Sequence, residues 1–174
     1  MPSWFYSIAM KKLLLLLIVL FVSIHARAQN SELVLEKGVE AHKGMDAIYR
    51  QFSESYRTLD AVKVVNLYTE TAAYLQPNDD LLQGRDKVRG IFAPFFEMVK
   101  KDGQTMTISF QIFQRQADTN LAYDVGIYTL RSYKDGKEIN IGRGKFVVVA
   151  VKEKDGVWRF QVDGYSGLKP VKKT

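Results

Sequence analysis

The second half of the chain contains four long segments that are rich in β-branched and aromatic residues. They span residues 105–114, 121–133, 139–152 and 157–166. Polar loops join these segments, and two of the loops contain the pairs Asp135-Gly136 and Asp155-Gly156, which are typical of β-hairpin turns. Consecutive strands joined by short turns pair in antiparallel order. The sequence therefore predicts a meander of long antiparallel strands.

The first half of the chain has helical patterns. Apolar residues recur at helical spacing over residues 33–59, and Asp60 resembles the N-cap of a second helix over residues 61–68. A short strand over residues 72–75 leads to a third helix over residues 84–101, in which Pro94 should cause a kink or a break.

Helices followed by a meander indicate an α+β fold. N-terminal helices packed on a curved, mainly antiparallel sheet form a cone-shaped barrel with one open end. Such a cone is a natural place for a ligand cavity.

The first 28 residues have the features of a secretory signal peptide. Lys11 and Lys12 precede an apolar run over residues 13–22, and Ala26-Arg27-Ala28 forms a cleavage site of small residues. The apolar run is shorter than the roughly 20 residues that a membrane-spanning helix needs. We therefore expect Met10 as the initiator, cleavage after Ala28, and a secreted or periplasmic protein without a stable membrane anchor.

Removal of this peptide changes what the composition implies. The chain of 174 residues has a formal charge of +6, which would fall to +3 after cleavage, so nucleic acid is not an expected partner. The chain has no cysteine, which excludes disulfides, thiolate metal sites and cysteine nucleophiles. It has no phosphate-binding or metal-binding motif, and we expect no cofactor. After the signal peptide we predict an N-terminal helix extension at 29–44, a domain at 45–168 and a basic tail at 169–174.

Four sequence motifs occur in the order found in one known superfamily. They are residues 67–78 (LYTETAAYLQPN), 84–88 (GRDKV), 142–146 (GRGKF) and 154–160 (KDGVWRF). With these motifs the chain resembles the nuclear transport factor 2-like, or SnoaL-like, superfamily, whose members are cone-shaped α+β barrels with a cystatin-like fold. It is similar to a branch of unknown function related to steroid delta-isomerase homologues and to the calcium/calmodulin-dependent kinase association domain.

The resemblance implies where a steroid isomerase of this fold would carry its catalytic groups. Such enzymes use a carboxylate base that abstracts a proton, and a tyrosine and a neutral carboxylic acid that donate hydrogen bonds to the charge that develops. Counted from the motifs, these positions fall on Gln76, Phe52 and Val148, which cannot take those roles. Dehydratase relatives need a His-Asp pair, and His42 is the only histidine after the predicted cleavage site. We therefore expect no isomerase activity of this type.

Strand periodicity and the resemblance together predict the residues of a ligand pocket. Gln161, Asp163 and Tyr165 share one face of the last strand, and Tyr74 and Gln76 share one face of the first. The full predicted set is Phe52, Tyr56, Tyr74, Gln76, Phe92, Phe96, Tyr128, Val148, Gln161, Asp163 and Tyr165. We hypothesise that Asp163 is the central polar group, with a pKa raised by burial; the alternative is an exposed carboxylate at a strand end.

Asp124 is the second acidic candidate. It shares a strand face with Tyr128, but the sequence does not show whether that face points inward. The alternative role is an ion pair across the sheet with Arg143 or Lys145.

These observations predict an exported domain that binds a small, partly apolar molecule. One alternative is an isomerase-, cyclase- or hydrolase-like enzyme that uses Asp163 or Asp124 as acid or base. Another is an oligomerisation module whose cone is filled by Phe92, Phe96 and Tyr165. Residues 146–151 are apolar on both faces of their strand, which predicts a homodimer formed through the sheet.

Overall fold

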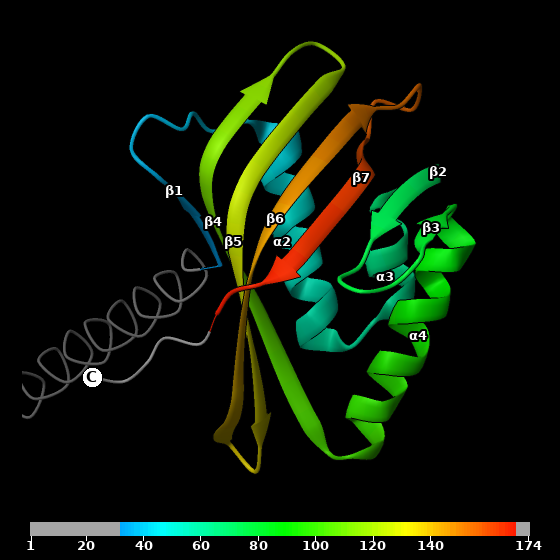
Figure 1. Ribbon diagram of the computed structural model, residues 1–174, viewed down its shortest axis with the longest axis vertical. Coiled ribbons are helices and arrows are strands. Elements are labelled where there is room, and N and C mark those ends of the chain that lie inside the picture. The colour runs from blue at the N-terminus through cyan, green and yellow to red at the C-terminus, as the bar shows by residue number, and fades with distance from the viewer. Residues whose placement is uncertain (1–31, 170–174) are drawn as a thin grey trace, which may run out of the picture. The chain divides into compact units, whose positions relative to one another are not determined.

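The computed structural model describes residues 32–169, which form one seven-stranded sheet and three helices (Figure 1). The strands are β1 (Leu33–Leu35), β2 (Tyr68–Leu75), β3 (Leu81–Gln83), β4 (Gln104–Ala117), β5 (Leu121–Lys134), β6 (Lys137–Lys152) and β7 (Trp158–Gly167). The helices are α2 (Lys43–Thr58), α3 (Ala61–Val65) and α4 (Arg85–Lys101). The strand order is β1-β4-β5-β6-β7-β2-β3, with β4 to β7 as the predicted antiparallel meander. This arrangement confirms the α+β prediction.

The predicted signal peptide and residues 170–174 of the basic tail lie outside the described residues. Within residues 32–169, no helix is both long enough and apolar enough to cross a bilayer.

The segment at the start of the described chain is a strand, whereas the sequence predicted a helical extension. β1 pairs in parallel with β4, and Leu33 lies opposite Phe110. α2 begins only at Lys43, where His42 Nδ1 accepts a hydrogen bond from the Met45 N–H at 3.1 Å. Pairing with the free edge of β4 satisfies the backbone groups of this segment, and apolar spacing along the chain carries no information about such a distant partner.

The connection from α3 to β2 also differs from the prediction. Asp60 caps α3 as expected and accepts a hydrogen bond from the Lys63 N–H at 3.0 Å, but α3 ends at Val65 and β2 already begins at Tyr68. β2 is longer than predicted because it pairs in parallel with β7, where Phe160 lies opposite Tyr68. This pairing joins segments that are about 90 residues apart.

The core lies between the helices and the concave face of the sheet. Phe52 of α2 packs against Phe110 of β4 with ring centroids 5.6 Å apart, and against Phe92 of α4 at 6.0 Å. α4 passes through Pro94 as one helix, so of the two predicted outcomes, a kink or a break, the break does not occur. The burial of apolar side chains of α4 offsets the cost of the backbone hydrogen bond that Pro94 cannot make.

Gly126 of β5 has no room for a side chain. An added Cβ would lie 2.5 Å from Cζ of Phe146 and 2.6 Å from the backbone oxygen of Gln111. We expect Gly126→Ala to lower the free energy of unfolding by about 1–3 kcal/mol, because β4 cannot move away without losing its pairing. Urea-induced unfolding measures the change. Gly142→Ala on β6 is the matched control, since its Cβ would meet no atom within 4 Å, and equal losses in both variants would contradict the expectation.

Candidate functional site

The concave face of the sheet, α2 and α4 surround a cavity of about 310 Å³. This volume is at the lower end of the range of roughly 300–1,000 Å³ that is typical of small-molecule sites. The lining residues are Tyr49, Phe52, Tyr56, Tyr74, Gln76, Ile91, Phe92, Phe95, Ile108, Phe110, Tyr128, Leu130, Phe146, Val148, Phe160, Asp163 and Tyr165. Most are aromatic, and Asp163 is the one carboxylic acid among them.

Nine of the eleven residues predicted for the pocket line this cavity. Phe96 and Gln161 do not. Phe96 is buried against the ring of Tyr56, with centroids 5.1 Å apart. The amide of Gln161 is turned toward β2, where its Oε1 accepts a hydrogen bond from the Thr69 hydroxyl at 2.8 Å.

A β-bulge in β7 explains why Gln161 departs from the predicted alternation. Phe160 lies opposite Ala150 of β6 and Val162 lies opposite Val149, which leaves Gln161 as the extra residue. The bulge shifts the alternation by one residue, so that Phe160 and Asp163 both reach the cavity although their separation is odd.

Asp163 belongs to the cavity wall. Its direct neighbours across the sheet are Val148 on β6 and Tyr74 on β2, and its side chain is buried, with 8% of the residue exposed. The Tyr68 hydroxyl donates a hydrogen bond to Asp163 Oδ2 at 2.6 Å. Burial raises the pKa of Asp163 from 3.8 to about 6, and the hydrogen bond from Tyr68 partly opposes this shift.

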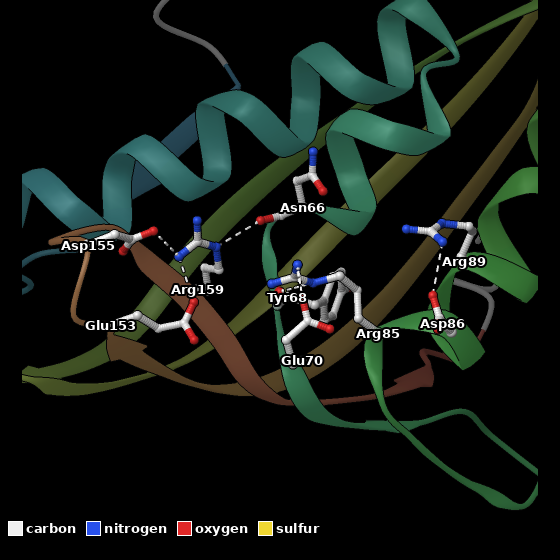
Figure 2. A network of polar contacts seen from close by, with 9 residues as sticks. All are labelled: Asn66, Tyr68, Glu70, Arg85, Asp86, Arg89, Glu153, Asp155 and Arg159. Atoms are coloured by element: carbon white, nitrogen blue, oxygen red, sulfur yellow. Dashed lines mark hydrogen bonds and ion pairs between the residues drawn. The ribbon is translucent and has the colours of Figure 1, made fainter.

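Two arginines that do not line the cavity bond to the backbone at Tyr68 and at the nearby Asn66 (Figure 2). Arg85 Nε donates to the backbone oxygen of Tyr68 at 2.8 Å, and its guanidinium also pairs with Glu70. Arg159 Nε donates to the backbone oxygen of Asn66 at 3.2 Å. These bonds hold the connection from α3 to β2, and therefore the ring whose hydroxyl reaches Asp163.

Asp124 lies outside the cavity lining and forms a buried ion pair. Arg115 donates to its two carboxylate oxygens, from Nε and from Nη2, each at 2.8 Å, and donates to Asp46 Oδ1 at 2.6 Å. Burial by itself lowers the pKa of Arg115, but hydrogen bonds to both carboxylates raise it overall and keep the guanidinium charged.

The predicted ion pair of Asp124 with Arg143 or Lys145 is therefore wrong. Arg143 lies opposite Thr129 and Lys145 opposite Ile127, on the other face of the sheet from Asp124. Asp124 faces inward, but Arg115 holds both of its oxygens. It has no exposed surface with which to act as acid or base.

Tyr49 lies between the ion pair and the cavity. Its hydroxyl is buried and has no hydrogen-bond partner among the described residues. Burial, followed by the charge of Asp124, raises its pKa well above the ordinary value, so the hydroxyl stays protonated. It is the one buried side-chain polar group of the described chain left without a partner, and it belongs to the cavity lining.

The three positions at which the resemblance implied catalytic groups all face the cavity. Gln76, Phe52 and Val148 contribute an amide, a phenyl ring and an isopropyl group to its wall. His42 lies elsewhere, at the start of α2, with its ring edge-on to Trp158 at 4.9 Å. In the described residues no three His, Cys, Asp or Glu side chains gather in a way that could hold a metal ion.

Two polar residues of this region, Arg115 and Tyr68, were not predicted from the sequence. Arg115 could have been found from the hairpin turn, because pairing outward from residues 117–120 places it opposite Asp124. Tyr68 was assigned to a helix, and no local signal corrects that assignment, since its strand depends on the distant β7.

Asp163→Asn and Asp124→Asn should change stability in opposite directions. Because the folded-state pKa of Asp163 is raised, its stabilising contribution is greatest below about pH 4 and is lost as the pH rises from about 4 to 6. At pH 8, Asp163→Asn should therefore raise the free energy of unfolding by up to about 3 kcal/mol, with little change at pH 4. Asp124→Asn should lower it by about 3–5 kcal/mol at pH 8, because Arg115 loses its partner.

Denaturant unfolding at pH 4 and pH 8 measures both effects, and wild type at each pH is the reference. A loss of stability at pH 8 in Asp163→Asn as large as that in Asp124→Asn would contradict the assignment of an unpaired, desolvated carboxylate.

Comparisons with known proteins concern the fold. No protein-family model and no curated protein matches the chain. Among solved structures, an NTF2-like protein with a cystatin-like fold from Novosphingobium aromaticivorans matches 87% of this chain and 90% of its own, at 10% identity and a TM-score of 0.62. A putative calcium/calmodulin dependent protein kinase II association domain from Xanthomonas campestris matches 78% and 93%, at 19% identity and a TM-score of 0.62.

A ketosteroid isomerase-like protein from Erwinia carotovora matches 73% of this chain and 95% of its own, at 14% identity and a TM-score of 0.58. These structures confirm at the level of fold the resemblance that the sequence motifs indicated. The chain therefore has the cystatin-like, NTF2-like fold that ketosteroid isomerase-like proteins share.

Proposed function

We propose that the protein binds a small, largely apolar molecule in the cavity. The observation that carries this proposal is the lining itself, in which aromatic and aliphatic side chains surround a single carboxylate. Such a surface removes apolar area of a ligand from water and leaves a few polar groups to orient it.

The binding proposal includes export. The sequence features of residues 1–28 support removal of a signal peptide and action in the periplasm or outside the cell. The alternative of an oligomerisation module with a filled cone has less support, because Phe92 and Tyr165 border a cavity of about 310 Å³.

A second candidate is acid–base catalysis by Asp163. Its support is the 2.6 Å hydrogen bond from Tyr68 together with the pKa of about 6, which is near the range that a general acid or base requires. This candidate differs from simple binding in one measurable respect. The bound molecule would be chemically altered by wild type and left unaltered by Asp163→Asn.

Filling the cavity tests the binding proposal. We expect N-phenyl-1-naphthylamine, a neutral apolar dye, to bind one site per chain with a rise in fluorescence. Val148→Phe places a ring in the cavity and should weaken binding at least tenfold, whereas Val147→Phe, on the opposite face of the same strand, should not. Dye binding by a folded Val148→Phe protein with wild-type affinity would overturn the proposal. Ile91→Trp on α4 is a second filling variant should Val148→Phe not fold.

The same proposal includes a homodimer formed through the outer face of the sheet. Leu75, Val125 and Val147 lie close together there on β2, β5 and β6, and each is at least one-third exposed. An apolar patch on a sheet face supports contact with a second copy of the chain, which would remove it from water.

Light scattering at micromolar concentration should give the mass of a dimer. Val147→Lys should shift the protein toward the monomer, because it would bury a charge in the interface. Val157→Lys, an exposed apolar residue in the turn between β6 and β7, is the control and should leave the mass unchanged. A monomeric wild-type protein would count against the dimer.

A further inference from the structure

We propose that the cavity is selective for small organic cations, amines or quaternary ammonium compounds whose charged group lies beside Asp163 among the tyrosine rings. This inference rests on the proposed binding function and assigns the ligand its chemical class.

The first argument is the balance of charge. Asp124 has Arg115 as a counter-ion within the protein wall. Asp163 has no ion pair among the described residues, and none of the residues that line the cavity is lysine, arginine or histidine. The side chain of Asp163 accepts a hydrogen bond from the neutral hydroxyl of Tyr68. A buried carboxylate without a counter-ion is costly, and a cationic ligand would supply the missing charge.

The second argument is the kind of surface around the carboxylate. Tyr74 lies opposite Asp163 in the pairing of β2 with β7, and its ring centroid is 5.8 Å from that of Tyr165 and 6.0 Å from that of Phe92. Tyr128 extends this cluster, 6.0 Å from Tyr165. Aromatic rings attract cations through their quadrupoles, and clusters of rings recognise quaternary ammonium groups. The aromatic rings and the carboxylate therefore both favour a positively charged ligand.

The third argument concerns Gln76 and Tyr165, two partly exposed residues of the lining. Gln76 Nε2 donates to Asp79 Oδ2 at 3.4 Å, and Gln76 Oε1 accepts from the Tyr165 hydroxyl at 3.5 Å. The exposed carboxylate of Asp79 thus lies next to lining residues, and after burial its charge and that of Asp163 raise the pKa of Tyr165. Two carboxylates, one in the cavity wall and one next to it, attract cations and repel anionic ligands.

Asp163 is the group of the cavity that gains or loses a proton between pH 5 and 8. The other titratable groups that line the cavity are tyrosines: Tyr49 and Tyr56 from α2, Tyr74 from β2, Tyr128 from β5 and Tyr165 from β7. Tyr68 from β2 contacts Asp163 through its hydroxyl. Burial raises the pKa of each of these tyrosines, so all stay neutral in this range. The lining residues of α4, β4 and β6 do not titrate. Cation affinity should therefore follow the ionisation of one carboxyl group.

A pair of probes with the same shape tests the inference. Phenyltrimethylammonium and tert-butylbenzene differ in charge and not in outline, and neither titrates. Calorimetry on the full mature chain at pH 8 should give phenyltrimethylammonium at least tenfold tighter binding. Between pH 8 and pH 5 its affinity should fall about tenfold as Asp163 takes up a proton, while that of tert-butylbenzene stays constant.

Asp163→Asn should abolish both the preference for the cation and its pH dependence. Asparagine keeps an oxygen that can accept the hydrogen bond from Tyr68, so the variant retains the local geometry. The pH series on wild type gives an independent test should the variant not fold.

The outcomes separate this inference from the binding function. Equal affinity for the two probes, or a preference for tert-butylbenzene, would overturn the cation assignment and leave the binding function standing. Binding of N-phenyl-1-naphthylamine but of neither smaller probe would also overturn it. Failure of all three compounds to bind would overturn both.

Discussion

The cross-strand register of the long strands is the constraint on which both the core and the cavity depend. One row of neighbouring residues crosses the concave face, from Arg115 through Asp124, Val148 and Asp163 to Tyr74. A slip of one residue between any two of these strands would turn a set of side chains to the opposite face. The same hydrogen-bonded ladder therefore sets the positions of the ion pair, the carboxylate and the rings.

The two aspartates in this row are buried to a similar degree but differ in how their charge is compensated. Asp124 has a counter-ion fixed by two hydrogen bonds from one guanidinium, which occupies both of its carboxylate oxygens. Asp163 has one hydroxyl and a cavity in front of it, so its charge depends on pH and on what the cavity holds. Burial alone does not identify a functional carboxylate. The absence of an internal counter-ion is the more informative property.

The parts of this fold that could be predicted from sequence are those set by local chemistry. Asp-Gly turns and β-branched segments gave the meander to within a few residues, and period-two alternation placed Asp163 and Tyr165 on one face. The rest depends on partners distant in sequence. β1 and Tyr68 at the start of β2 are in strands because of what they pair with, and the local apolar spacing resembled that of a helix. Gln161 was misplaced because a bulge breaks the alternation that predicted it.

A second bulge, in β4, has the same geometric effect as the one in β7. Ile112 lies opposite Gly126 and Gln114 lies opposite Val125, so the extra residue Phe113 turns Arg115 to the inner face. Each bulge thus turns one charged residue to the inner face where strict alternation would have placed its neighbour, Gln114 in β4 and Val162 in β7. Movement of the β7 bulge by a few residues toward the C-terminus would turn Val162 inward and Asp163 outward. Within this fold, the polarity of a cavity can therefore change by the displacement of one unpaired residue, without any substitution in the wall.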